Sequence, residues 1–288
     1  LATHWLRVGY VQGNMNSDNS ALSGVTLDYG PFAFMERFDP SYNPWTGGGA
    51  PYCYANQPQA LANNLVGLSG AFNALLAEVC REEEISLAEI TAELQAAVSH
   101  GYVDAFHARH DDNCRAKLGL TEWDASAQRL WSELFGLMGR RSGKGGVDFT
   151  LLFRSLSVPP PAEGATGDAS LLDVVRPAAL DDVDSWPAED REAWADWLRR
   201  YWERVDDDCR PLADRLGEMR GANPKYILRN WMAKEAYEAA AGDDCEAVRE
   251  VLEVLSRPYE EQSVAAEERW GRPTPQWARE KMGIAFMT

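Results

Sequence analysis

The chain has 288 residues, of which 45% are hydrophobic and 25% are charged, with a formal net charge of −17. This length and balance are typical of an ordinary globular protein that forms one large domain or two smaller ones. The strong negative charge argues against a nucleic-acid partner, and no apolar run approaches the ~20 residues that cross a bilayer, so we expect no membrane span.

The chain opens with LATHWLRVGY, which lacks an initiator Met and is already in a helical pattern. We therefore expect it to continue a longer protein, whose upstream part would hold any targeting peptide.

The segment Gln12–Phe32 (QGNMNSDNSALSGVTLDYGPF) carries the clearest strand signal in the chain. Asn19–Leu22 and Val25–Asp28 flank Ser23-Gly24, which predicts a short β-hairpin with Asn19 opposite Asp28. Directly opposed residues have Cβ atoms roughly 4.5–5.5 Å apart, close enough for two side chains to share one cation.

Such a pair suits magnesium. Mg²⁺ prefers oxygen ligands and usually takes only one or two carboxylates, together with the phosphate oxygens of a nucleotide such as ATP. Asn19 and Asp28 are therefore the predicted metal ligands. Neighbouring side chains on an extended backbone point in opposite directions, so Asp18 would lie off the metal and act as a general base.

The chain beyond this segment predicts helices. A capping-box pattern at Ser86 and Glu89 begins one of them, and Asn223-Pro224 predicts the start of another. The expected helical ranges are 57–80, 86–106 with a break near Gly101, 125–140, 149–156, 188–205, 223–241 and 246–255. The Pro-rich segment 158–168 reads as a linker between a unit at 1–157 and a helical unit at 169–288.

Five cysteines stand at wide, irregular spacing without a CxxC motif. This pattern predicts reduced thiols rather than a disulfide framework.

Other motifs favour ordinary structural roles. Trp194, Trp197 and Tyr201 fall on one face of a helix, as core residues do. His107 and His110, with Cys114, have ligand-like spacing, but a solvated helix face is the favoured interpretation. For Arg229 we expect a buried structural ion pair.

Protein kinases use a related order of polar residues: a catalytic loop H-R-D-x-x-x-x-N, then a hairpin, then D-F-G. On this pattern Asn19 takes the place of the kinase Asn, and residues 28–30 (DYG) stand at D-F-G. Residues 12–14 (QGN) fall on H-R-D, so the usual catalytic Asp is absent and an acid occurs instead at Asp18.

These departures resemble the selenoprotein O (SelO/YdiU) family of kinase-like protein adenylyltransferases. The family pattern H-G-x-x-N-T-D-N, followed by I-D-Y-G-P-F, is matched by QGNMNSDN and LDYGPF. Further matches follow in order along the chain: PYCYANQPQ (51–59), DFTLLFRSLS (148–157), NPKYILRNW (223–231), RPYEEQ (257–262) and P-x-W (275–277).

The resemblance implies a mainly α fold. It would comprise a protein-kinase-like C-lobe with a short catalytic β-hairpin and a helical C-terminal extension, while the N-lobe would precede Leu1. The implied reaction is transfer of AMP from Mg-ATP, with Mn²⁺ able to replace Mg²⁺, to Ser, Thr or Tyr hydroxyls of protein substrates. The family's proton acceptor falls on Asp18 and its metal ligands on Asn19 and Asp28, with Asp28 also close to the nucleotide. The implied compartment is the mitochondrion in eukaryotes and the cytoplasm in bacteria.

The chain departs from the family at three points. Gln12 stands where the family usually has His, and Ser17 where it usually has Thr. The tail KMGIAFMT lacks the Cys or selenocysteine that many members carry near the C-terminus, so we do not expect a redox switch there.

Two alternatives stay open. The same site could transfer the γ-phosphoryl group as a kinase does, or the chain could be a helical binding module without activity of its own.

Overall fold

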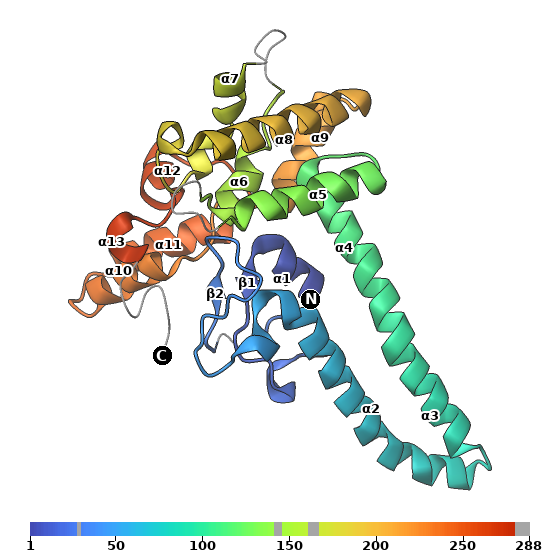
Figure 1. Cartoon of the computed structure of the whole chain (residues 1–288). Coiled ribbons are helices and arrows are strands. Elements are labelled where there is room, and N and C mark those ends of the chain that lie inside the picture. Colours follow the sequence, from blue (N-terminus) through green and yellow to red (C-terminus); the bar gives the residue numbers. More distant parts are fainter. Residues whose placement is uncertain (28–29, 141–145, 161–166, 280–288) are drawn as a thin grey trace.

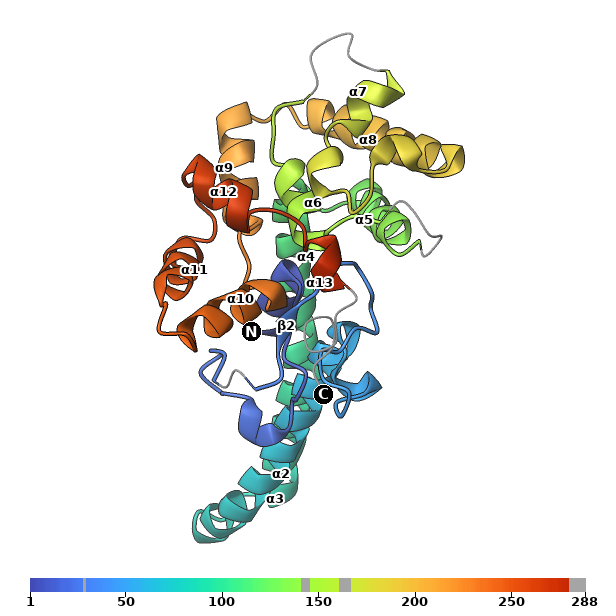
Figure 2. The ribbon, with the colours of Figure 1, turned by 90° about the vertical axis from the view of Figure 1, so that its left-hand side faces the viewer.

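The computed structural model describes residues 1–27, 30–140, 146–160 and 167–279 (Figure 1). These residues are mainly helical, as predicted, with a single two-stranded sheet among them. Figures 1 and 2 both show a body of packed helices from which a long helical arm projects.

The short sheet lies at the N-terminal end of the body. Helix α1 (Ala2–Val8) ends at Gly9, whose φ of 75° is the left-handed conformation that glycine adopts without strain. Strand β1 (Tyr10–Val11) follows and pairs antiparallel with β2 (Ala33–Phe34), with Val11 opposite Ala33.

The predicted hairpin between Asn19 and Asp28 is wrong for the residues that the structure describes. Ser17–Asn19 form a 3-10 helix, η1, and residues 20–27 form no strand. Their apolar side chains, Leu22 at 74% exposed and Leu27 at 61%, have no core to cover. Because an isolated two-stranded hairpin is marginal in water, pairing occurs instead where Val11 and Ala33 are buried.

The arm consists of α2 (Gln57–Glu82) and α3 (Leu87–Ala96), which continues into α4 (Tyr102–Leu118) through a π turn at Ala97–Gly101. The helix at 57–80 and the Ser86 cap are confirmed, since the Ser86 hydroxyl accepts the amide of Glu89. Gly101 does not break the helix, because the π turn absorbs the irregularity.

Helix α2 also bears on the prediction that no segment spans a membrane. By length and composition alone, the helix covering Tyr54–Glu82 would be able to cross one, with a mean hydropathy of 1.3 over a window that is 11% buried. One such helix is also found in proteins that never enter a membrane, so the expected lack of a span stays a prediction.

The body is built around one large hydrophobic core. Its helices are α5 (Ala125–Met138), α6 (Phe149–Ser155), α7 (Asp168–Leu172), α8 (Ala188–Asp207) and α9 (Leu212–Ala222). Trp194, Trp197 and Tyr201 of α8 lie in this core, as predicted. The same core takes residues from both sides of the segment 158–168, and the division into two units stays a prediction.

A second, smaller core joins the C-terminal helices. They are α10 (Asn230–Ala240), α11 (Glu246–Ser256), α12 (Val264–Trp270) and α13 (Gln276–Arg279).

The predicted helix start at Asn223-Pro224 is wrong, because α10 begins at Asn230. The Asn223 side chain does not cap a helix. Its amide nitrogen donates to the carbonyl of Lys117 at 3.0 Å, and its oxygen accepts from Nζ of Lys117 at 2.9 Å. The amides of Lys225 and Tyr226 donate to the carbonyl of Pro258, so tertiary hydrogen bonds hold residues 223–229 out of a helix.

Arg229 forms the buried ion pair that was predicted. Its Nη1 lies 2.6 Å from Oδ2 of Asp148 and 3.6 Å from Oε1 of Glu36, and the Arg229 and Asp148 side chains are 2% and 0% exposed. Asp148 also accepts the amide of Leu151 and so caps α6. The pair thus ties the C-terminal helices to the large core. All five cysteines are free thiols, as predicted.

Candidate active site

The segment with the family motif, residues 12–20, is anchored between β1 and the start of α2. Gln57, fully buried at the first turn of α2, accepts the amide of Gln12 at 3.0 Å and donates to the carbonyl of Tyr10 at 2.9 Å. The Gln12 side chain is buried and accepts the Tyr10 hydroxyl at 2.5 Å. Gln12, which stands where the family usually has His, therefore supports the loop from its buried side and is not part of its exposed surface.

Gly13 brings this loop against the segment that follows Asp28. Its φ is 71°, and a Cβ at this position would lie 2.0 Å from the carbonyl oxygen of Pro31. Only glycine fits such a contact. The two motif segments, residues 12–19 and residues 30–32, are thus packed against each other at this point.

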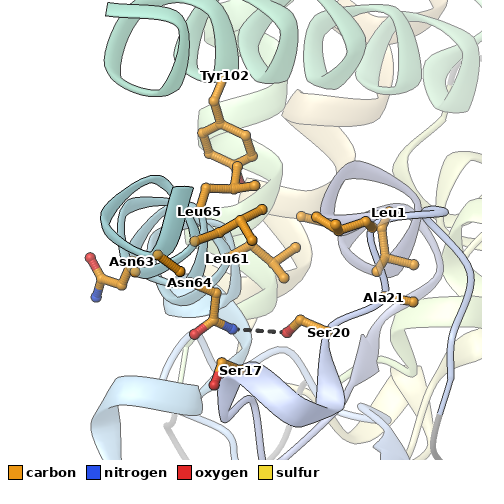
Figure 3. A pocket seen from close by; sticks show the side chains of 14 residues that line it. Leu1, Ser17, Ser20, Ala21, Leu61, Asn63, Asn64, Leu65 and Tyr102 are labelled. Carbon is orange, nitrogen blue, oxygen red and sulfur yellow. Dashed lines mark hydrogen bonds between the residues drawn. The ribbon is translucent and has the colours of Figure 1, made fainter. Parts of the chain in front are cut away.

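One side chain of α2 holds both ends of the 3-10 helix. The amide nitrogen of Asn64 donates to the carbonyl of Met15 and to the hydroxyl of Ser20, each at 2.9 Å (Figure 3). On the other side of the loop, the Tyr52 hydroxyl donates to the side-chain oxygen of Asn16 at 2.7 Å. These bonds fix the backbone that carries Asp18.

The structure places two of the three predicted site residues next to each other. Asp18 is exposed in the middle of η1, and Asn19 is half-buried at its end. The side-chain nitrogen of Asn19 donates to the carbonyl of Asn14 at 3.3 Å. This bond does not use the side-chain oxygen of Asn19, which is the atom that can bind a hard cation. Asp28, the third predicted residue, lies outside the described residues.

The 3-10 helix changes one step of the argument for these roles. Asp18 and Asn19 are not on an extended backbone, so the alternation of side chains along a strand does not separate them. Their division into base and metal ligand stays a prediction.

The side-chain oxygen of Asn19 suits magnesium by its chemistry, since this ion prefers oxygen ligands, takes few of them from the protein and keeps its other positions for water and phosphate. No cluster of three or more His, Cys, Asp or Glu side chains that could hold a metal occurs within the described residues. A site for a softer ion such as zinc therefore finds no support there.

A cavity of about 820 Å³ opens beside the loop, between η1 and α2. Figure 3 shows Ser17 and Ser20 from the loop, Leu61 and Leu65 from α2, and Tyr102 around it. None of its lining side chains carries a charge. Its apolar wall suits side chains of a partner better than phosphate groups.

The two histidines and the cysteine of α4 do not lie together on one exposed face. His107 is exposed, as predicted, but His110 is half-buried and Cys114 is buried, with Sγ 3.5 Å from Nε2 of His110. Burial raises the pKa of the Cys114 thiol and lowers the pKa of His110, so both are held neutral. A protonated thiol is a poor nucleophile and a poor metal ligand.

Comparison with known proteins assigns the chain that carries this loop to a family. The family model of the protein adenylyltransferase SelO matches residues 1–256. The chain belongs to the SelO family. Relatives named protein nucleotidyltransferase YdiU include those of Nitrosospira multiformis and Xanthomonas campestris, each 34% identical over the whole chain, and that of Rhodopirellula baltica at 33%. The chain spans about half the length of these SelO relatives, 51% or 52% of each.

The sequence alone did not reveal the residues that support the motif loop, residues 12–20. Gln57 lies within the matched segment 51–59, so a family signal marked its neighbourhood without giving its role. Asn64 lies in the long helix between that segment and the next match, and no local pattern distinguishes it from Asn63. Only the packing of α2 on the loop reveals its function.

Proposed function

We propose that this chain supplies the catalytic loop of a protein adenylyltransferase, which transfers AMP from Mg-ATP to Ser, Thr or Tyr hydroxyls of proteins. The observation that carries the proposal is the fixed 3-10 helix, which presents Asp18 to solvent beside Asn19 within a motif of this family. The proposal includes a kinase-like C-lobe, completed by an upstream N-lobe, and a cytoplasmic protein, since the named relatives are bacterial.

In the proposed reaction the substrate hydroxyl attacks the α-phosphorus of ATP, and pyrophosphate leaves. Asp18 accepts the hydroxyl proton, for which its exposed position is suited. Asn19 and Asp28 hold Mg²⁺, or Mn²⁺ in its place. The bound ion would neutralise charge on the phosphate oxygens. The hydrogen bonds from Asn64 keep Asp18 and Asn19 in one arrangement while substrates come and go.

Kinase-type transfer of the γ-phosphoryl group is the competing reaction for the same residues. Asn14 stands where kinases have their catalytic Asp, and its carbonyl and side chain are used within the loop. This arrangement favours the adenylyl-transfer proposal.

The test uses the protein at the length of its relatives, incubated with ATP, Mg²⁺ and a protein mixture, with intact mass as the readout. Addition of AMP supports the proposal, and addition of phosphate alone contradicts it. Asp18→Ala should lower transfer by at least ~100-fold while Mg-ATP binding measured by calorimetry persists. Asp28→Ala should remove both.

An exposed acid at the end of α8, Asp207→Ala, is the matched control and should leave both measurements unchanged. Equal loss of ATP binding in Asp18→Ala and Asp28→Ala would contradict the proposed roles. Calorimetry of the 288-residue chain, with and without Mg²⁺, then shows whether these residues bind ATP without the upstream part.

A further inference from the structure

Helix α2 carries an unbroken apolar stripe along one side. Its members recur at alternating spacings of four and three residues, which is the pattern of the a and d positions of a coiled coil. They are Leu61, Leu65, Leu68, Phe72, Leu75 and Val79. Such a stripe normally packs against another helix.

The described part of the chain leaves much of this stripe uncovered. Phe72 is 42% exposed, Leu75 66% and Val79 50%. Helix α3 packs on a neighbouring side of α2, where the Thr91 hydroxyl donates to the side-chain oxygen of Asn73 at 3.1 Å. It therefore does not cover the stripe.

The stripe leads into the cavity beside the 3-10 helix. Leu61, Leu65 and Leu68 line that cavity from α2, as do Leu22 and Tyr102 from other segments. Figure 3 shows Leu61 and Leu65 facing it beside Tyr102. The cavity and the exposed stripe thus form one groove, which runs from the candidate active site toward the tip of the arm.

The charge of the arm limits what can occupy this groove. Between Gln57 and Asp104 there are seven acidic side chains, all exposed, against a single cation, Arg81, for a net charge of −6 (seven minus one). The acids are Glu78, Glu82–Glu84, Glu89, Glu93 and Asp104. An anionic membrane surface or the same arm of a second copy would be repelled.

We propose that the groove along α2 binds an amphipathic helix of another protein, with an apolar stripe flanked by Lys and Arg. The heptad spacing selects a helical occupant, and the acidic tip selects a basic one. This inference depends only on the surface of the arm, so it holds or fails independently of the proposed nucleotidyl transfer.

The test uses a defined probe, a fluorescein-labelled 21-residue peptide with Leu at a and d and Lys elsewhere. Its counterpart has Glu in place of Lys. Fluorescence anisotropy should show that the Leu/Lys peptide binds the 288-residue chain at least tenfold more tightly than the Leu/Glu peptide. The double variant Phe72→Gln/Leu75→Gln should weaken this binding at least tenfold.

The matched control is Val66→Gln, which changes an equally exposed apolar residue on the opposite side of the same helix. It leaves the charge unchanged and should leave binding unchanged. Unchanged binding in the double variant would mean that the peptide recognises charge alone, and equal losses in Val66→Gln and the double variant would mean that the stripe is not the binding surface. Either result would overturn the proposal.

Three other results would also overturn it, each by naming a different occupant. Self-association in sedimentation velocity that the double variant abolishes would assign the groove to a second copy. Binding to phosphatidylcholine vesicles, lost in the same variant, would assign it to lipid. Peptide binding by the 288-residue chain that disappears in a protein of the relatives' length would assign it to the upstream part of the protein itself.

Discussion

Helices α2 and α8 carry similar apolar stripes but lie in opposite surroundings. On α8, Trp194, Trp197 and Tyr201 are at most 1% exposed and pack in the large core. On α2, the equivalent side chains of Phe72 and Leu75 lie at the surface of an arm that projects from the body (Figure 2). Periodicity thus identifies the side of a helix that seeks a partner, but not whether that partner is in the same chain.

The largest expected effect is on the α8 side of this comparison. Trp197 is fully buried, stacks on Tyr201 with ring centroids 5.2 Å apart, and donates its indole N–H to the carbonyl of Leu130 at 2.8 Å. Trp197→Ala should lower the free energy of unfolding by about 3–5 kcal/mol, measured by urea denaturation. Glu203→Ala, at an exposed position of the same helix, is the control. A loss below about 1 kcal/mol would show that the α8 stripe is not a packed core.

An intermediate effect concerns Lys117 of α4, which lies against the Phe149 and Phe153 rings of the same core. Its Nζ is buried, donates to the carbonyl of Arg7 at 2.7 Å and to Asn223, and lies 3.8 Å from the centre of the Phe153 ring. Burial, together with the charge of Arg7, holds the pKa of Lys117 well below its ordinary value of 10.5. Its two hydrogen bonds need only the two N–H groups of a neutral amine.

The sign of the pH dependence follows from this lowered pKa. Between the folded pKa and 10.5 the unfolded chain binds a proton at Lys117 that the folded chain does not, so raising the pH favours folding. The free energy of unfolding, relative to that of Lys117→Met, should therefore rise from about pH 7 to about pH 9.5. Urea denaturation at both pH values measures it. A constant or falling difference would contradict the lowered pKa.

The smallest effect is expected on the arm. Leu75→Gln replaces a side chain that is 66% exposed and should change the free energy of unfolding by less than about 0.5 kcal/mol. The same urea measurement tests it. A loss of about 2 kcal/mol, as for a buried leucine, would mean that the stripe is covered within this chain and would remove the contrast between α2 and α8.

Local patterns predicted most of the helices, because apolar spacing and caps act over a few residues. The cap at Ser86 and the helices α2, α5, α8 and α11 are where the sequence placed them. The failures occurred where distant contacts decide the backbone. Lys117 hydrogen-bonds the side chain of Asn223, and the carbonyl of Pro258 accepts the amides of residues 225 and 226. No pattern within residues 223–226 indicates these distant partners.

In the candidate site, too, local features could be predicted from the sequence and features set by distant contacts could not. The motif singled out Asp18 and Asn19 because residue types and their order are local, and the structure shows both in one 3-10 helix. Their roles stay predictions. The predicted hairpin was wrong, since strand pairing depends on a core that Leu22 and Leu27 do not reach. The support from Gln57 and Asn64 arises only when α2 folds against the loop.

The length of α2 gives the arm the mechanics of a lever. At about 1.5 Å per residue its 26 residues extend roughly 39 Å, while Asn64 stands only about 10 Å from its first residue. A tilt of about 5° around the fixed Gln57 end would displace the tip by about 3 Å but Asn64 by less than about 1 Å. Any displacement of the tip therefore reaches the hydrogen bonds that hold the loop at only about a quarter of its size.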